Sequence, residues 1–290
     1  MLVQVHPMST QNQYLLNKLT SLLIVTSFIV ISSCNNNKSD LETLNLEWFD
    51  DFNGVSLDTN FWNVEYGNGC PDLCGFGNNE AQTYTGSNHN LRIENGKLIL
   101  RATFDSIFKS VKLTTANHVD FNTGIVEVSA KLPNSRGCWP AIWLLPTLER
   151  PLNWPLDGEI DIMENVGYFP NYVYGTIHTS TYNHLKGTQL SDSVFITNPH
   201  DSFHTYKLVW TDSTLEWLVD DIRFHFLEKS SSDGVEEWPF NEPFHLIINL
   251  AVGGNWGGKE GIDTLSFPQN FEIDYVKIKS PSVMKGFKYL

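Results

Sequence analysis

Three carboxylates lie close together in the segment GEIDIMEN, residues 158–165. Glu159 and Asp161 are two residues apart, so in a β-strand their side chains share one face. Glu164 falls out of this alternation, and one inserted residue, a β-bulge at 162–163, would return it to that face. Neighbouring carboxylates raise one another's pKa, so packing alone gives no reason to gather them. The other interpretation is the polar outer face of an edge strand.

Carboxylates arranged in this way can hydrolyse a glycosidic bond. One acts as nucleophile or base, and the other holds a proton near neutral pH, which a neighbouring negative charge favours. Glu159 and Glu164 form the outer pair, and Asp161 between them can bond one partner and keep their pKa values apart. The spacing does not decide between retention and inversion, because two glutamates that lean inward can reach either separation.

Tryptophans precede the acids. Residues 137–146 read GCWPAIWLLP, and Trp154-Pro155 follows just before the acid segment. An indole face stacks well on the apolar C–H face of a sugar ring. Trp139 and Trp143 share a face if the segment is extended, although either could instead belong to the core. The adjacent prolines favour a cleft position for Trp139 and leave Trp143 open.

Strands must position these side chains. From about residue 42 onward, short runs with a period of two are separated by turn signals such as Asn95-Gly96. No long helical pattern or internal repeat is present in the sequence. We therefore expect one all-β domain, a sandwich or a barrel. The predicted strands are 97–103, 124–132, 206–210, 215–220, 244–250 and 271–278.

Composition limits the classes of function. The chain has 290 residues, of which 41% are hydrophobic and 13% aromatic, and this is enough for a large core. Its formal net charge of −14 argues against nucleic acid and against attraction to other anionic polymers. A neutral substrate is compatible with this charge, whereas a sulfated one is disfavoured.

The N-terminal segment resembles an export signal. Lys18 precedes the apolar run 19–31, which is shorter than the roughly 20 residues of a spanning helix. Small residues then precede Cys34, as in a bacterial lipoprotein box. We expect residues 1–33 to be removed and Cys34 to be lipidated; cleavage that leaves a free Cys34 thiol is the alternative. Asn35 after this cysteine favours the outer membrane of a bacterial envelope.

The remaining chain is expected to contain a polar tether, residues 34–45, and a catalytic domain, residues 46–280. Three more cysteines are present, Cys70, Cys74 and Cys138. Export makes a disulfide plausible, but the sequence leaves all three single pairings open. A zinc site is not indicated, because no C-x-x-C motif or nearby histidine pair accompanies these cysteines.

Together the segments resemble glycoside hydrolase family 16, and in particular its laminarinase branch of endo-β-1,3-glucanases. The resemblance rests on GEIDIMENVG at 158–167, GCWPAIWLLP at 137–146 and NLAVGGNWG at 249–257, and it extends over most of residues 46–279. The extra residue between the acids is typical of this branch. The resemblance implies a β-jelly-roll sandwich of two curved antiparallel sheets with a substrate cleft across the concave face.

The resemblance also implies a retaining mechanism and residue roles. Glu159 is similar to the nucleophile and Glu164 to the general acid/base, while Asp161 would orient and tune Glu159. His178, in the motif GTIH, matches a cleft histidine near the acid/base. The other residues matched to the substrate cleft are Trp139, Trp143, Trp256, Asn79 and Glu80, the last two in a GNNE loop.

No cofactor is expected for the chemistry, although family members often carry one structural calcium ion. The matching positions are Asp51 and Gly96, through backbone carbonyls, and the side chain of Asp274. Calcium takes oxygen ligands, and an acid inside the apolar strand 271–278 needs a partner. We expect a monomer whose partners are a neutral β-glucan and, through the lipid anchor only, a membrane.

The sequence also departs from the family. Residues 114–117 read TTAN where laminarinases usually have Thr-Ser-Ala-Arg, so a basic residue of the cleft is missing and the linkage preference is open. The 70–74 loop enters the region of the negative subsites. We expect endo-hydrolysis of β-1,3-glucans such as laminarin, with mixed-linkage β-glucan, then agarose or carrageenan, as alternatives. A non-catalytic glycan-binding lipoprotein would be expected to have a broken acid set, but this chain keeps all three acids.

Overall fold

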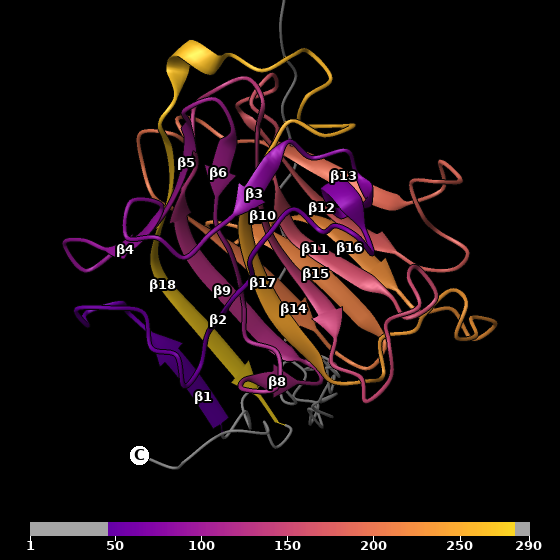
Figure 1. Ribbon diagram of the computed structural model, residues 1–290. Helices are drawn as coiled ribbons and strands as arrows, with labels where there is room; N and C mark the ends of the chain where they lie inside the picture. Colours follow the sequence, from indigo (N-terminus) through magenta and orange to yellow (C-terminus); the bar gives the residue numbers. More distant parts are fainter. Residues whose placement is uncertain (1–45, 282–290) are drawn as a thin grey trace, which may run out of the picture. The chain divides into compact units, whose positions relative to one another are not determined.

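The computed structural model describes residues 46–281, which form two β-sheets packed face to face (Figure 1). The predicted signal peptide, the lipidation site Cys34 and the tether lie outside the described residues. Within residues 46–281 the helical segments are two short 3₁₀ turns, η1 (Cys74–Gly77) and η2 (Thr264–Ser266). No helix of this part of the chain is long and apolar enough to cross a membrane. The predicted all-β sandwich is confirmed.

One sheet, here called the back sheet, has the strand order β16-β15-β14-β9-β18-β5-β6-β3, with β1 beside β18 and β4 beside β5. Its pairs are antiparallel as predicted, except for the short pair β3–β6, which is parallel. Its strands are β1 (Leu46–Asp50), β3 (Gln82–Tyr84), β4 (Leu91–Ile93), β5 (Leu98–Phe104), β6 (Phe108–Ser110), β9 (Gly124–Lys131), β14 (His204–Trp210), β15 (Thr214–Val219), β16 (Ile222–Glu228) and β18 (Gln269–Ser280).

The other sheet, here called the cleft sheet, has the order β13-β12-β11-β10-β17-β7-β2, with β8 beside β17. All six strands named in the sequence analysis are present, as β5, β9, β14, β15, β17 and β18, with ends within two residues of those predicted. The strands of the cleft sheet are β2 (Asn63–Val64), β7 (Lys112–Thr114), β8 (Asp120–Phe121), β10 (Cys138–Pro146), β11 (Glu159–Glu164), β12 (Tyr172–His178), β13 (Leu190–Phe195) and β17 (Phe244–Val252).

The core fills the space between the sheets and is rich in aromatic side chains. Trp210 and Trp217, from adjacent strands of the back sheet, are fully buried there. The Trp217 indole N–H donates to the backbone carbonyl of Asp161 in β11, at 2.8 Å. Gly175 in β12 leaves room for this ring, because a Cβ there would lie 2.5 Å from Trp217 Cδ1. Trp217 of the back sheet therefore fixes the position of β11, the strand that carries the acids, relative to the back sheet.

Strand β11 contains the predicted bulge. Its pairing with β12 shifts register between Asp161 and Glu164. Ile162 and Met163, which lie between them, are both buried in the core. Glu159, Asp161 and Glu164 consequently line a pocket on the opposite face of the strand. The prediction that an extra residue returns Glu164 to the face of the other two acids is confirmed.

Candidate active site

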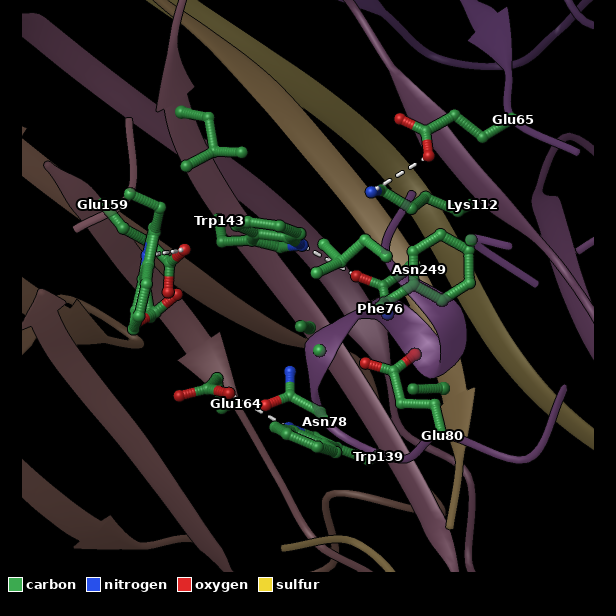
Figure 2. Close-up of a pocket in the computed structure, with 18 of the residues that line it drawn as sticks. Glu65, Phe76, Asn78, Glu80, Lys112, Trp139, Trp143, Glu159, Glu164 and Asn249 are labelled. Atoms are coloured by element: carbon green, nitrogen blue, oxygen red, sulfur yellow. Dashed lines mark hydrogen bonds and ion pairs between the residues drawn. The ribbon is translucent and has the colours of Figure 1, made fainter. Parts of the chain in front are cut away.

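A pocket of about 850 Å³ lies on the face of the cleft sheet, and the three acids line it (Figure 2). Alternate residues of neighbouring strands build its floor, as expected for side chains that share one face of a sheet. The floor residues are Trp139, Ala141, Trp143 and Leu145 of β10, Asn249 and Ala251 of β17, and Lys112 of β7. Asn78 and Glu80 line the pocket from the loop before β3, on the side away from Glu159 (Figure 2).

Glu159 is held in place by a tryptophan from the preceding loop. The Trp154 indole N–H donates to Glu159 Oε2 at 3.0 Å. The Trp154 ring also packs on His178 and His184, with ring centroids 5.9 and 5.1 Å away. The sequence analysis noted Trp154 but gave it no role. The available signal was its position five residues before Glu159, across the short turn at Asp157-Gly158.

Glu164 has a similar donor on the other side. The Trp139 indole N–H donates to Glu164 Oε1 at 3.0 Å (Figure 2). Trp256 packs edge-on against Trp139, with centroids 5.5 Å apart, and against Tyr174, 5.1 Å away. Trp139 lines the pocket, as predicted, whereas Trp256 is not among the lining residues. Trp256 therefore lies beside the pocket, in contact with the ring of Trp139, and its predicted contact with substrate stays a prediction.

His178 is buried beside Asp161 and Glu159. Its Nε2 lies 3.4 Å from Asp161 Oδ2 and 3.7 Å from Glu159 Oε1. His178 is the strand partner of Glu159, so the structure places its imidazole beside the predicted nucleophile. It also does not line the pocket. Burial and the neighbouring His184 lower the pKa of His178 to about 4, so its imidazole is neutral at physiological pH.

Burial and mutual repulsion shift the titration of the acids. Removal from water, together with the Glu164 charge, raises the pKa of Glu159 to about 8. Burial raises the pKa of Glu164 to about 7, against the Trp139 hydrogen bond, and it raises that of Asp161 well above the usual range. Because two close carboxylates resist being ionised together, one acid of the pair keeps its proton to a higher pH than the other. The roles implied by the resemblance place that proton on Glu164, whereas the order of the two pKa values favours it on Glu159.

The far side of the pocket contains a cation that the sequence analysis missed. Lys112 is the strand partner of Asn249, and its Nζ lies 3.0 Å from Glu65 Oε2. The ammonium also lies 5.3 Å from the centroid of the Trp143 ring. The Trp143 indole donates to Asn249 Oδ1 at 2.7 Å, so Trp143 belongs to the pocket and not to the core. The cleft is therefore not without a basic residue, although position 117 holds none.

Of the two residues predicted from the GNNE loop, Glu80 lines the pocket and Asn79 does not. Glu80 lines the pocket, where its Oε2 accepts from the Gln82 amide at 2.6 Å and where burial raises its pKa. Asn79 points away, is exposed and donates to Asn255 Oδ1 at 2.8 Å. The preceding residue, Asn78, lines the pocket instead. The positive φ of Asn79, 56°, accompanies this reversal of side-chain direction.

A disulfide joins Cys70 to Cys74, which is one of the three pairings that the sequence left open. Cys138 is a buried free thiol. Leu73 of the bridged loop lines the pocket, together with Gly69 just before the loop and Phe76 two residues after it. The disulfide therefore constrains a loop that forms one side of the pocket.

The positions predicted for calcium lie away from the pocket. Asp274 is partly exposed and its Oδ1 lies 2.8 Å from Lys97 Nζ, so an ammonium already supplies the partner for which a metal was inferred. Asp51 accepts from the Asn53 amide, whose oxygen lies close to Gly96. The one group of three described His, Cys, Asp or Glu residues that could share a metal ion is Glu159, Asp161 and His178, within the acid cluster.

A sheet face that carries two carboxylates, each held by an indole N–H, beside a tryptophan-lined pocket is the arrangement of a glycoside hydrolase. The chain belongs to the glycosyl hydrolases family 16, whose family model matches residues 77–277. It is 38% identical over 281 residues to a beta-glucanase of Rhodothermus marinus, covering 91% of this chain and 96% of that protein. It is also 36% identical over 252 residues to a glucan endo-1,3-beta-glucosidase of Cryptopygus antarcticus, covering 80% of this chain and 90% of that protein.

Among solved structures, the laminarinase from Flavobacterium sp. UMI-01 superposes with a TM-score of 0.75 at 39% sequence identity, over 80% of this chain and 99% of that chain. The comparisons confirm the predicted family, the jelly-roll fold and the hydrolase class.

Proposed function

We propose that the protein hydrolyses internal β-1,3-glucosidic bonds of neutral β-glucans such as laminarin, with retention of configuration. The observation that carries the proposal is the placement of Glu159 and Glu164 on one face of β11, each with its own indole donor. The relatives named as an endo-1,3-beta-glucosidase and a laminarinase support the choice of linkage. The indole rings of Trp139 and Trp143 on the floor of the pocket offer apolar surface on which a neutral sugar chain can stack.

In the first step Glu164 donates its proton to the glycosidic oxygen while a Glu159 oxygen attacks the anomeric carbon. The leaving sugar departs with that proton, and Glu159 remains bonded to the glycosyl unit. In the second step the Glu164 carboxylate takes a proton from water, whose oxygen attacks the anomeric carbon and releases Glu159. Each bond is broken on the face opposite to the new one, so two inversions give retention.

Asp161 and His178 act behind Glu159 in this proposal. Asp161 is buried, and its Oδ2 faces His178 Nε2 at 3.4 Å. Its raised pKa favours the protonated form, which can donate a hydrogen bond to a neighbouring acceptor. A proton held there also limits the negative charge around Glu159, because two adjacent carboxylates would otherwise have to ionise together. Asp161 and His178 are therefore positioning residues for the nucleophile.

Reducing-sugar release by residues 35–290 tests the proposal on laminarin, mixed-linkage β-glucan, agarose and carrageenan at equal mass. We expect laminarin to be cut fastest and the variants Glu159→Gln and Glu164→Gln to lose at least about 10³-fold in kcat, as expected when nucleophile or acid is removed. Glu149→Gln, an exposed site nearby in the chain, is the control. Cutting of another polymer alone would overturn the substrate and leave the acids in place. Retardation in a laminarin gel without turnover of any polymer would favour the binding lipoprotein.

Azide distinguishes the two glutamates. With Glu159→Ala, azide attacks the anomeric carbon directly and gives the α-glucosyl azide. With Glu164→Ala, azide attacks the glycosyl-enzyme and gives the β-glucosyl azide. The assignment is contradicted if the two variants give the opposite anomers.

The N-terminal anchor is a further part of the proposal. We infer from the sequence that the protein is exported and held at the bacterial outer membrane by a lipid on Cys34. Mass spectrometry of the mature N-terminus and fractionation of the Cys34→Ala variant, which should become soluble, test this. Light scattering of residues 35–290 tests the expected monomer.

Calcium binding at Asp51, Gly96 and Asp274 stays a prediction from the family resemblance. Asp274 could ligate calcium only if the Lys97 ammonium moved away. Thermal unfolding with calcium and with a chelator tests it, and a resident ion would raise the melting temperature through its binding to the folded state alone. Equal melting temperatures would reject the site.

A further inference from the structure

Three exposed aromatic side chains form a patch outside the pocket. Phe169, Tyr172 and Phe195 are 52%, 39% and 57% exposed. Their rings touch in series, with centroids 6.2 Å apart for Phe169–Tyr172 and 5.6 Å apart for Tyr172–Phe195. We call these three residues the aromatic platform. Single exposed apolar residues are ordinary, but a contiguous aromatic patch is typical of a binding surface.

The platform lies on the same sheet face as the acids. Glu164 is the strand partner of Tyr174, and Tyr172, two residues earlier in β12, shares the face of Tyr174. Phe195 in β13 is in turn the strand partner of Tyr172. Its neighbour Val194 points to the other face and packs on the core. Strands β11, β12 and β13 are adjacent in Figure 1, so the platform extends the pocket face toward the edge of the sheet.

Aromatic side chains lie between the platform and the acid/base. Tyr174, which shares the face of Tyr172, packs edge-on against Trp256, with ring centroids 5.1 Å apart. Trp256 lies 5.5 Å from Trp139, which in turn donates to Glu164. Aromatic side chains therefore line this face of the sheet from Glu164 to the platform.

The chemistry around the platform indicates its ligand. Residues 168–175 and 193–198 contain no charged side chain. Exposed Ser191 and Ser193 of β13 lie on the same face as Phe195 and offer hydroxyl groups. Aromatic faces beside neutral hydroxyls suit the C–H faces and hydroxyls of an uncharged sugar chain. A nucleic acid or a sulfated polymer would find no cation on these segments.

We propose that the aromatic platform binds the neutral β-glucan chain beyond the pocket, on the side of Glu164. The inference rests on the proposed function, because Glu164 protonates the departing sugar and the chain held there is the part released. The platform lies outside the pocket, so it acts on polymers and not on substrates short enough to fill the pocket alone. It therefore sets a preference for long chains.

The test compares the double variant Phe169→Ala/Phe195→Ala with the wild type. The expected result is a fall of about 5- to 30-fold in kcat/KM for laminarin, in keeping with the loss of two stacking rings. Activity on laminaritetraose should stay within about twofold, since a short chain does not reach the platform. Phe49→Ala is the matched control, because Phe49 is 51% exposed on β1 of the back sheet. This variant should behave as wild type on both substrates.

A binding measurement separates this inference from the proposed function. In a Glu159→Gln background, which cannot turn over, the platform variant should be retarded less than its parent in a laminarin gel. Unchanged retardation and unchanged laminarin kinetics would overturn the inference even if laminarin is hydrolysed. Equal losses on tetraose and polymer would overturn it as well, because the platform would then be part of the pocket. A wild-type dimer that the double variant dissociates, seen by light scattering, would replace it with a contact between copies.

Discussion

Trp154 and Glu159 are joined by a hydrogen bond of 3.0 Å from the indole N–H to Oε2, and Trp139 makes the same bond to Glu164 Oε1. Neither donor belongs to β11, which carries both carboxylates: Trp154 comes from the loop before it and Trp139 from the neighbouring strand. Both bonds favour the ionised form and so oppose the effect of burial on the pKa. Each acid therefore has a hydrogen-bond donor of its own, one on either side of the pair.

The first prediction concerns Trp154→Phe, which removes the N–H and keeps an aromatic ring. The pKa of Glu159 should rise, because the hydrogen bond to its ionised form is lost. Since the nucleophile must be ionised, the acidic limb of the kcat/KM profile should move to higher pH by about one unit. At pH 6 we expect a loss of up to about 10-fold, because a shift of one pKa unit changes the ionised fraction by at most a factor of ten.

Trp139→Phe is the matched control at the other acid. Removing its N–H should raise the pKa of Glu164, which must be protonated, so the basic limb should move to higher pH. Complete pH profiles of both variants decide the roles. Movement of the same limb in both variants would contradict the separate assignments of Glu159 and Glu164.

The second prediction concerns stability and pH. A carboxyl whose pKa is higher in the folded state binds its proton more tightly there, so its contribution to stability is complete below about 4.5 and is lost as the pH rises through the folded value, about 8 for Glu159. Glu159→Gln cannot ionise. It should exceed the wild type in free energy of unfolding by roughly 1–3 kcal/mol at pH 8 and by little at pH 4, since one pKa unit corresponds to about 1.4 kcal/mol.

Urea unfolding at the two pH values measures this difference. Glu149→Gln removes an exposed carboxylate and should leave the stability unchanged at both. A Glu159→Gln variant that is no more stable than the wild type at pH 8 would show that burial does not strain the ionised nucleophile.

Local patterns in the sequence were enough to predict the strands and the acid face. Period-two runs placed strand ends within two residues, because burial of alternate side chains is a local property. The bulge in β11 was readable because Glu164 broke that period while Ile162 and Met163 stayed apolar. Spacing also indicated that Trp139 and Trp143 share a face, and both line the pocket.

Features that depend on pairing between distant segments could not be predicted in this way. His178 lies by Glu159 because β12 pairs with β11 in a register that the bulge shifts. Lys112 reaches the pocket because β7 pairs with β17, which is 137 residues away at the paired position Asn249. Asn78 replaces Asn79 in the pocket because of a left-handed backbone in the loop. Each of these needs the three-dimensional pairing or a loop conformation.

The third prediction concerns Lys112, the pocket cation that the sequence analysis did not identify. Lys112→Met removes an ammonium that neutralises Glu65 and lowers the pKa of Glu159 and Glu80. We expect KM for laminarin to rise several-fold, and the acidic limb to move to higher pH by less than one unit. Lys109→Met is the control, because Lys109 pairs with Asp105 on the exposed β5–β6 hairpin. An unchanged KM for Lys112→Met would exclude a role of the ammonium in substrate binding.

The fourth prediction uses two buried tryptophans of the back sheet that differ in their hydrogen bonds. Trp217 donates to the carbonyl of Asp161 at 2.8 Å, whereas the indole nitrogen of Trp210 has no partner among the described residues. Trp217→Phe leaves a buried carbonyl with one bond fewer and should cost about 1–3 kcal/mol of stability. It should also lower kcat, because the Asp161 backbone is no longer fixed from behind.

Trp210→Phe loses similar ring volume without losing a hydrogen bond, so it should cost less and leave kcat near the wild-type value. Urea unfolding and laminarin kinetics of the two variants make the comparison. If Trp210→Phe lowers kcat as much as Trp217→Phe, the effect arises from general loosening of the core. A selective loss with Trp217→Phe would mean that the back sheet supports catalysis through one bond to the bulged strand.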